Sequence, residues 1–175
     1  ATPIVILWYG GSSLSSFQSA CVVSSTSEIN QKLSSSAEDK RWAPPSPGEL
    51  KLSTDSSVST VLSHSGLEAI IRDSAGHVLS ILAIHHHRVA SLLQAELLAI
   101  CEGLMFAASL GVSVTVLESD SRLAIQAINS GAIHSLERFI VIVDDIIKLL
   151  TMVKGGTCCY VPRQMNKQPN LVWVL

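Results

Sequence analysis

The pattern of hydrophobic and polar positions changes at about residue 49. Between residues 10 and 48 serine is frequent and apolar residues keep no sustained period, as in segments that stay flexible because they bury too little apolar surface. From residue 49 onward, alternating runs and helical periods follow one another. We therefore expect a Ser-rich, flexible N-terminal segment over residues 1–41 and a folded domain over residues 42–175.

Three strand patterns open the folded domain. They cover residues 50–55, 66–72 and 77–84, and the sequence Asp-Ser-Ala-Gly at 73–76 is a turn between the second and the third. Because the connections are short, the three strands are expected to pair as an antiparallel meander.

Helical periods and strands alternate in the rest of the domain. Ser91 is a favoured helix N-cap and Gly111 is a favoured helix stop. The expected elements are a helix over 91–109, a strand over 112–117, a helix over 121–131, a helix over 136–153 and a strand over 157–161. The order β-β-β-α-β-α-α-β predicts an α/β fold with helices packed on a mixed five-stranded sheet.

Composition limits the function without identifying it. The 175 residues are 47% apolar, which is enough for one domain with a core. The net charge of −2 excludes a global positive field, so any nucleic-acid binding needs a local basic patch. No run approaches the roughly 20 apolar residues of a membrane span, and the four cysteines have no zinc-binding spacing. We expect a soluble protein without a membrane partner, in a reducing compartment such as cytoplasm or nucleus, and the missing initiator Met indicates a trimmed or fragmentary N-terminus.

Three carboxylates stand where metal-dependent chemistry would need them. Asp55 ends the first strand, and Asp120 follows an apolar strand at the start of a helix. Glu96 borders the apolar stripe of the long helix, where Gly103 permits close approach to the sheet. Each has an ordinary alternative: a turn residue for Asp55, an exposed helix position for Glu96 and an N-cap for Asp120. Glu118, two residues earlier on the same strand, competes with Asp120.

Convergent carboxylates on rigid elements suit two-metal phosphoryl transfer. Two divalent ions about 4 Å apart activate water and stabilise the leaving oxygen, and carboxylates are the hard oxygen ligands that Mg²⁺ prefers. The spacing along the chain leaves open whether the three side chains meet.

Five sequence blocks resemble a known family in their correct order. They are Trp42–Asp55, Ala69–Leu79, Gln94–Gly103, Leu117–Ser121 and Val161–Asn166. The chain resembles type 1 ribonuclease H from residue 42 to about 172, and it is most similar to the plant, reverse-transcriptase-like branch that is related to retroelements. The resemblance implies a ribonuclease H-like fold and endonucleolytic cleavage of the RNA strand of RNA-DNA hybrids, with Mg²⁺ or Mn²⁺ as the cofactor.

The resemblance also implies which residues act, and here the chain departs from the family. Asp55, Glu96 and Asp120 match the first three catalytic, metal-binding carboxylates, and the fourth catalytic position holds Asn170. A neutral amide offers one carbonyl oxygen and is a poorer ligand for a hard cation. Tyr160 stands where the family usually has a His and cannot easily shuttle protons at neutral pH. We expect weakened catalysis.

Nucleic-acid contacts are expected around these acids. The residues implied are Ser56, which replaces the family's usual Gly, together with Ser57, Arg122, Arg163 and Asn166. Arg72, Arg122, Arg163 and Lys167 could form a basic rim, or they could be scattered solvated charges. The chain ends at Leu175, so the family's last helix is expected to be truncated.

A noncatalytic module is the alternative function. It would keep the fold to bind nucleic acid, or to contact a protein partner or second copy through the apolar helix over 136–153. Asn170 and Tyr160 favour this alternative. A remnant without a selected function is the third possibility, because the chain has a Ser-rich start and an abrupt end.

Two other motifs carry weaker signals. His85-His86-His87 could bind a metal, since residues two apart on a strand share a face. No third ligand is evident nearby in the sequence, so an exposed strand end or loop is the favoured interpretation. Cys158 and Cys159 are expected to be one buried and one exposed thiol rather than a redox centre.

Overall fold

The computed structural model describes residues 4–9, 21–22, 42–59, 64–87, 89, 91–130 and 138–166. The strands are β1 (Ile4–Tyr9), β2 (Cys21–Val22), β3 (Lys51–Ser59), β4 (His64–Arg72), β5 (Val78–His87), β6 (Val116–Ser119) and β7 (Thr157–Tyr160). The helices are α1 (Leu92–Ser109), α2 (Arg122–Ser130) and α3 (Ile140–Met152). From β3 onward the element order is the predicted one.

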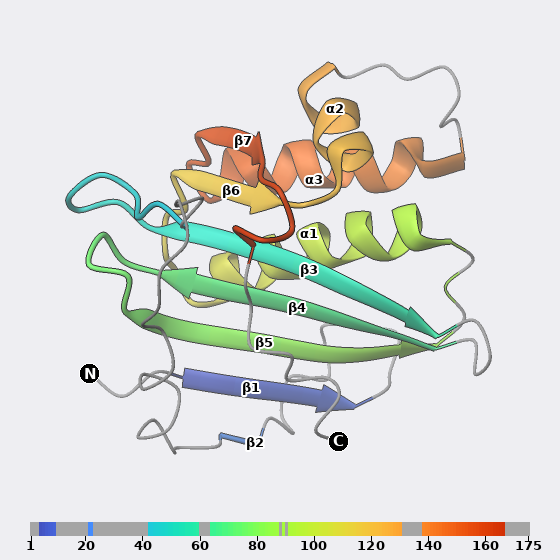
Figure 1. The fold of residues 1–175 in the computed structure, drawn as a ribbon, viewed down its shortest axis with the longest axis horizontal. Coiled ribbons are helices and arrows are strands. Elements are labelled where there is room, and N and C mark those ends of the chain that lie inside the picture. Colours follow the sequence, from blue (N-terminus) through green and yellow to red (C-terminus); the bar gives the residue numbers. More distant parts are fainter. Residues whose placement is uncertain are drawn as a thin grey trace.

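The predicted five-stranded mixed sheet is confirmed in the order β5-β4-β3-β6-β7 (Figure 1). Strands β3, β4 and β5 form the antiparallel meander, whereas β6 runs parallel to β3 and β7 runs parallel to β6. The helical crossovers between β5, β6 and β7 account for this change of direction, because parallel neighbours need a long connection.

Two further strands extend the sheet beyond β5. Strand β1 pairs in parallel with β5, and the short β2 pairs antiparallel with β1. Both come from the segment 1–41, which the sequence pattern separates from the folded domain. The flexibility expected for that segment stays a prediction, since the structure describes only these two pieces of it.

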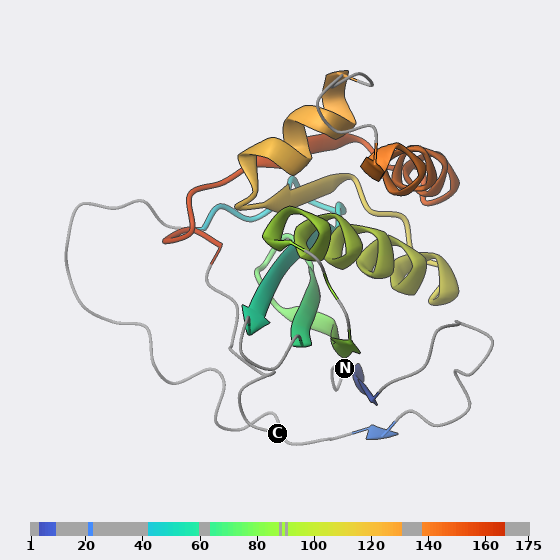
Figure 2. The same cartoon turned by 90° about the vertical axis from the view of Figure 1, so that its right-hand side faces the viewer.

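The helices α1 and α3 cover one face of the sheet, behind the strands in Figure 1. Helix α1 packs on β3 and β4, and α3 packs on α1 (Figure 2). Helix α2 contacts β6 and β7 and also touches α1 and α3. Leu97, Ile100, Leu104 and Phe106 of α1 are fully buried in the resulting core.

The ends of α1 follow the predicted signals. The Ser91 hydroxyl accepts a hydrogen bond from the Gln94 backbone N–H at 3.2 Å. Gly111 follows the helix with a positive φ of 67°, which a residue without a side chain adopts at little cost. By length and a mean hydropathy of 1.5, α1 could cross a membrane, but half of it is buried inside the domain. A central core helix has the same composition, so its packing accounts for its apolar character.

Some element boundaries differ from the expected ones. Strand β3 continues to Ser59, four residues beyond the predicted end, because it pairs with β4 along its whole length. Strand β6 begins at Val116, while Thr115 donates both its N–H and its hydroxyl to the Leu50 carbonyl. Helix α3 begins at Ile140. The predicted cap Ser135 lies outside the described residues.

Candidate metal centre

Asp55, Glu96 and Asp120 converge in the folded chain. Each offers one carboxylate oxygen, and these three atoms lie within 4.8 Å of one another. The sheet register explains the approach of the two aspartates. Thr54 of β3 lies opposite Ser119 of the parallel β6, and Asp55 and Asp120 directly follow these two residues in the sequence. The convergence that the sequence left open is therefore present.

Gly103 allows α1 to bring Glu96 close to the sheet. A Cβ atom placed on Gly103 would lie 3.0 Å from the Ala69 Cβ and 3.3 Å from the Thr54 Cγ2. A side chain at position 103 would therefore require the helix or these neighbours to shift. Because Glu96 lies two helical turns before Gly103, this contact holds the Glu96 backbone near β3.

Glu96 is the most buried of the three acids, with 5% of its surface exposed. Its Oε1 accepts a hydrogen bond of 2.7 Å from the Ser56 hydroxyl. Its Oε2 is buried and accepts no hydrogen bond from any residue that the structure describes. Burial raises the pKa of Glu96 to about 8, with smaller contributions from the charges of Asp120 and Asp55. A buried carboxylate oxygen without a donor is a position that a cation would satisfy.

Asp55 lies within β3 rather than in a turn, so its alternative explanation is wrong. Burial raises the pKa of Asp55 to about 6, and the negative charge of Asp120 adds to the rise. The Ser56 backbone N–H, which donates to the Asp55 Oδ1 at 2.8 Å, lowers it in part. The Asp55 carboxylate therefore lies beside another negative charge, that of Asp120.

Asp120 is not the cap of α2. Ser121 performs that role, because its hydroxyl accepts a hydrogen bond from the Ala124 N–H at 3.3 Å. The Asp120 carboxylate is left beside the other two acids, with 9% of its side chain exposed. Burial raises its pKa, while Arg163 lowers it from a distance of 3.8 Å between Nε and Oδ2.

Glu118, the competing candidate, belongs to a different buried cluster. Its Oε1 accepts a hydrogen bond from the Lys51 ammonium group. Lys51 and Arg72 both lie against the ring of Trp42, at 5.0 and 5.3 Å from its centroid. This cluster fixes the start of the domain against β3, β4 and β6.

The three converging acids fit a hard divalent cation. They supply oxygen donors from three separate elements, one of these oxygens lacks a hydrogen-bond donor, and the pKa of each acid is raised. Like charges this close are costly when ionised, and a bound cation removes that cost. The donor set is the kind that Mg²⁺ or Mn²⁺ prefers.

The residues predicted to contact nucleic acid have different surroundings. Arg163 is 76% exposed beside Asp120, and the exposed Arg122 lies over the ring of Tyr160 at 4.5 Å. The Ser56 hydroxyl donates to Glu96, and Ser57 is half-buried on β3. Asn166 is buried and donates its amide to the Thr54 carbonyl at 2.8 Å. Asn166 thus ties the segment after β7 to β3, and its contact with nucleic acid stays a prediction.

Arg72, another predicted position, does not join the site. Arg72 lies opposite Lys51 in the sheet, four residues along the strand from the Asp55–Glu68 pair, so it is not part of a rim with Arg163. Asn170 and Lys167 lie outside the described residues.

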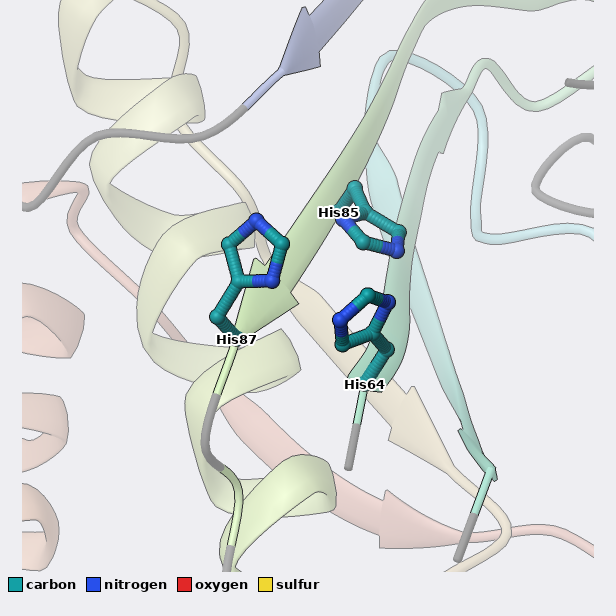
Figure 3. A group of neighbouring side chains, drawn as sticks. All are labelled: His64, His85 and His87. Atoms are coloured by element: carbon teal, nitrogen blue, oxygen red, sulfur yellow. The ribbon is translucent and has the colours of Figure 1, made fainter. Parts of the chain in front are cut away.

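One group of residues was missed by the sequence analysis. His64 of β4 joins His85 and His87 of β5, and one ring nitrogen from each lies within 4.8 Å of the others (Figure 3). A third imidazole is therefore present, although 21 residues separate it from His85. The antiparallel pairing of His64 with His87 is the signal that could have found it.

The chain matches the family model described as reverse transcriptase-like over residues 53–170. No curated protein matches the sequence. Among solved structures, the chain is similar to the ribonuclease H1 of the archaeon Halobacterium salinarum, with 20% identity, a TM-score of 0.62, and 68% of this chain and 89% of that one covered.

Two further ribonuclease H structures have the same fold. The N-terminal ribonuclease H domain of a Mycobacterium tuberculosis protein has 18% identity and a TM-score of 0.60, covering 67% of this chain and 85% of that one. A ribonuclease H1 isolated from compost, solved in complex with an RNA/DNA hybrid, has 16% identity and a TM-score of 0.59, covering 66% and 87%. The family match extends over most of the chain, and the chain therefore belongs to the reverse transcriptase-like family, with a ribonuclease H fold.

Proposed function

We propose that this protein cleaves the RNA strand of RNA-DNA hybrids endonucleolytically at the site formed by Asp55, Glu96 and Asp120. The observation that carries the proposal is the convergence of three carboxylates, from β3, α1 and the end of β6, within 4.8 Å. The family match and the similar fold of a ribonuclease H1 bound to an RNA/DNA hybrid support the choice of substrate.

In this proposal Asp55, Glu96 and Asp120 hold Mg²⁺ or Mn²⁺. A divalent cation there would stabilise negative charge on the scissile phosphate and lower the pKa of a bound water. The Ser56 hydroxyl fixes the orientation of the Glu96 carboxylate through its hydrogen bond to Oε1. We propose that Arg163, which is exposed beside Asp120, contacts a backbone phosphate. Water is the nucleophile, and no covalent intermediate forms.

The reaction is expected to be slow. Asn170 stands at the family's fourth ligand position, and a neutral amide attracts a hard cation less strongly than a carboxylate does. Tyr160, where the family usually has a His, is on β7 with Arg122 over its ring. A phenol is a poor substitute for imidazole in proton transfer.

The experiment is hydrolysis of an end-labelled RNA-DNA hybrid in Mg²⁺ and then in Mn²⁺. The native chain is compared with Asp55→Asn, with Asn170→Asp, and with Asp144→Asn as a control, since Asp144 is exposed on α3. We expect cleavage by the native chain and the control, its loss in Asp55→Asn, and faster cleavage by Asn170→Asp.

Two results would change the proposal. Cleavage by Asn170→Asp alone would mean that the three acids still form the site but that Asn170, at the fourth position, prevents catalysis by the native chain. Absence of cleavage by the native chain and every variant would contradict the proposed activity. It would favour the alternative, a noncatalytic module with the same fold.

The alternative rests on two observations. The fourth ligand position holds a neutral residue, and α3 exposes apolar side chains, of which Val141 and Met152 are 68% and 70% exposed. Asp144 and Lys148 interrupt this surface, so it is a mixed rather than a purely apolar face. A binding module would retain the hybrid without a divalent metal, and that retention would weaken with increasing salt.

A further inference from the structure

We propose that His64, His85 and His87 form a second metal site, built from nitrogen donors and suited to Zn²⁺. One ring nitrogen from each of the three residues lies within 4.8 Å of the other two. Figure 3 shows the three rings facing a common space at the ends of β4 and β5. This inference is independent of the proposed nuclease activity.

The sheet register places the three imidazoles on one face. His64 pairs directly with His87 across the two antiparallel strands. His85 lies two residues before His87 and therefore points to the same side of the sheet. The residue opposite His85 is Gly66, which has no side chain to fill the space between the rings. The backbone thus presents the three rings together without requiring a loop to fold over them.

The donor chemistry selects the kind of metal. Imidazole nitrogen is a good ligand for Zn²⁺, Cu²⁺ and Ni²⁺ and a poor one for Mg²⁺. Three histidines with an open fourth position form a known type of zinc coordination. Among the described residues, no Asp, Glu or Cys joins this group. The two clusters should therefore prefer different metals: the acids should bind hard cations, and the histidines should bind zinc.

The observed separations are close to those that zinc requires. In a tetrahedral site with Zn–N bonds of 2.0–2.1 Å, neighbouring nitrogens lie about 3.3 Å apart. From their limit of 4.8 Å the nitrogens would have to approach one another by at most about 1.5 Å. His87 is exposed and His64 and His85 are half-buried, so small side-chain rotations could achieve this without moving the strands.

The histidine cluster is separate from the acidic site. In the β3–β4 ladder His64 pairs with Ser59, whereas Asp55 pairs with Glu68. Four residues along a strand correspond to about 13 Å. Metal at one site therefore need not compete with metal at the other, and each can be removed by mutation without touching the ligands of the other.

Edge-to-face packing is the competing explanation for the cluster. The three rings meet at interplanar angles of 80° to 89°, with centroids 4.5 to 4.8 Å apart. Packing alone predicts no bound ligand, whereas metal binding predicts a metal ion bound in a fixed ratio to the chain.

The test is calorimetric titration of Zn²⁺ into the full chain without a histidine tag, in millimolar Mg²⁺ to occupy the acids. The variants are His85→Ala and His87→Ala. The matched control is His86→Ala, because His86 is the neighbour whose ring nitrogen lies 2.9 Å from the His87 carbonyl oxygen, outside the cluster. We expect one Zn²⁺ per chain in the native protein and the control.

Loss of either ligand should weaken binding by at least about tenfold, since even outer-shell changes at metal sites cost about 10- to 100-fold. His87→Ala keeps the test valid if His85→Ala fails to fold, because His87 is exposed. Substitution of Co²⁺ should give a visible spectrum without a thiolate charge-transfer band. Equal Zn²⁺ affinity in the native chain and both ligand variants, or no binding by the native chain, would overturn the proposal.

Discussion

At the scale of single residues, Glu96 combines a buried oxygen that lacks a donor with two neighbouring carboxylates. A buried carboxylate normally has a hydrogen-bond donor or a positive partner for each oxygen. Glu96 has the Ser56 hydroxyl on one oxygen and no described donor on the other. The oxygen without a donor therefore costs free energy in the metal-free protein, and a bound cation would remove this cost.

This cost predicts an unusual dependence of stability on pH. Because folding raises the pKa of Glu96 from 4.5 to about 8, the metal-free folded state binds more protons than the unfolded state between these values. The free energy of unfolding should fall as pH rises from about 4.5 to 8. Asp55, raised from 3.8 to about 6, adds to the lower part of this fall.

Glu96→Gln should remove most of this fall, because an amide does not ionise. At pH 8.5 and without metal, the variant should be more stable than the native chain by about 2–4 kcal/mol. The measurement is urea unfolding at pH 5 and pH 8.5 in the presence of a chelator. A native chain as stable at pH 8.5 as at pH 5 would contradict the proposed state of Glu96.

The sequence predicted the acids but not their immediate contacts. Asp55, Glu96 and Asp120 were recognisable because each stood at a meaningful place in a strand or helix pattern and matched a family motif. The Ser56–Glu96 hydrogen bond depends on how α1 sits over β3, which no local pattern encodes. His64 was not predicted because it lies 21 residues before His85 and joins the cluster only through the pairing of β4 with β5.

At the scale of elements, the site depends on the close packing of α1 on β3 and β4. Gly103 is the residue that permits this approach, with the Ala69 Cβ only 3.0 Å from where its own Cβ would be. Helix propensity alone would favour Ala there by up to about 1 kcal/mol. The presence of Gly inside a helix is therefore explained by packing.

Gly103→Ala should lower the free energy of unfolding by about 1–3 kcal/mol, as overpacking in a core does. It should also weaken Mg²⁺ binding, because the displaced helix carries Glu96 away from Asp55. The measurement is urea unfolding combined with metal titration. The double variant Ala69→Gly, Gly103→Ala is the control, since it restores the space.

Two outcomes would contradict this role of Gly103. One is a stable single variant with native metal affinity. The other is a double variant whose stability loss equals the sum of the two single changes, because coupled contacts should not be additive.

Element type and order were predictable, whereas several boundaries were not. Ser91 and Gly111 mark the ends of α1 because their effects are local. Strand β3 extends to Ser59 because β4 pairs with it, and β6 is shortened because Thr115 bonds to Leu50. Those limits are set by partners distant in sequence.

At the scale of the whole molecule, the five-stranded core followed from the alternation of strand and helix periods. The parallel addition of β1 to β5 could not be predicted in this way. Its pairing joins residues 4–9 to residues 80–85, and no local sequence pattern indicates it. The family's fourth ligand position, Asn170, lies beyond the described residues, so its contribution stays a prediction.

The net charge of −2 means that hybrid binding depends on a few local cations. We expect Arg163→Ala, in an Asp55→Asn background that prevents cleavage, to weaken hybrid binding and to reduce its salt dependence by about one phosphate contact. The measurement is binding to labelled hybrid at several salt concentrations. Lys148→Ala is the matched control, because Lys148 is equally exposed but lies on α3. An unchanged salt dependence in Arg163→Ala would place the binding surface elsewhere.

Mn²⁺ binding, rather than cleavage, tests most directly whether Asp55, Glu96 and Asp120 form one divalent-metal site. Catalysis could be lost at Asn170 even if the three acids bind metal. We expect the native chain and His85→Ala, which alters only the histidine cluster, to bind Mn²⁺ with similar affinity and to release protons at pH 7.5, because ligands must ionise to bind. Glu96→Gln should bind at least about tenfold more weakly. Equal Mn²⁺ affinity in the native chain and Glu96→Gln would contradict the account.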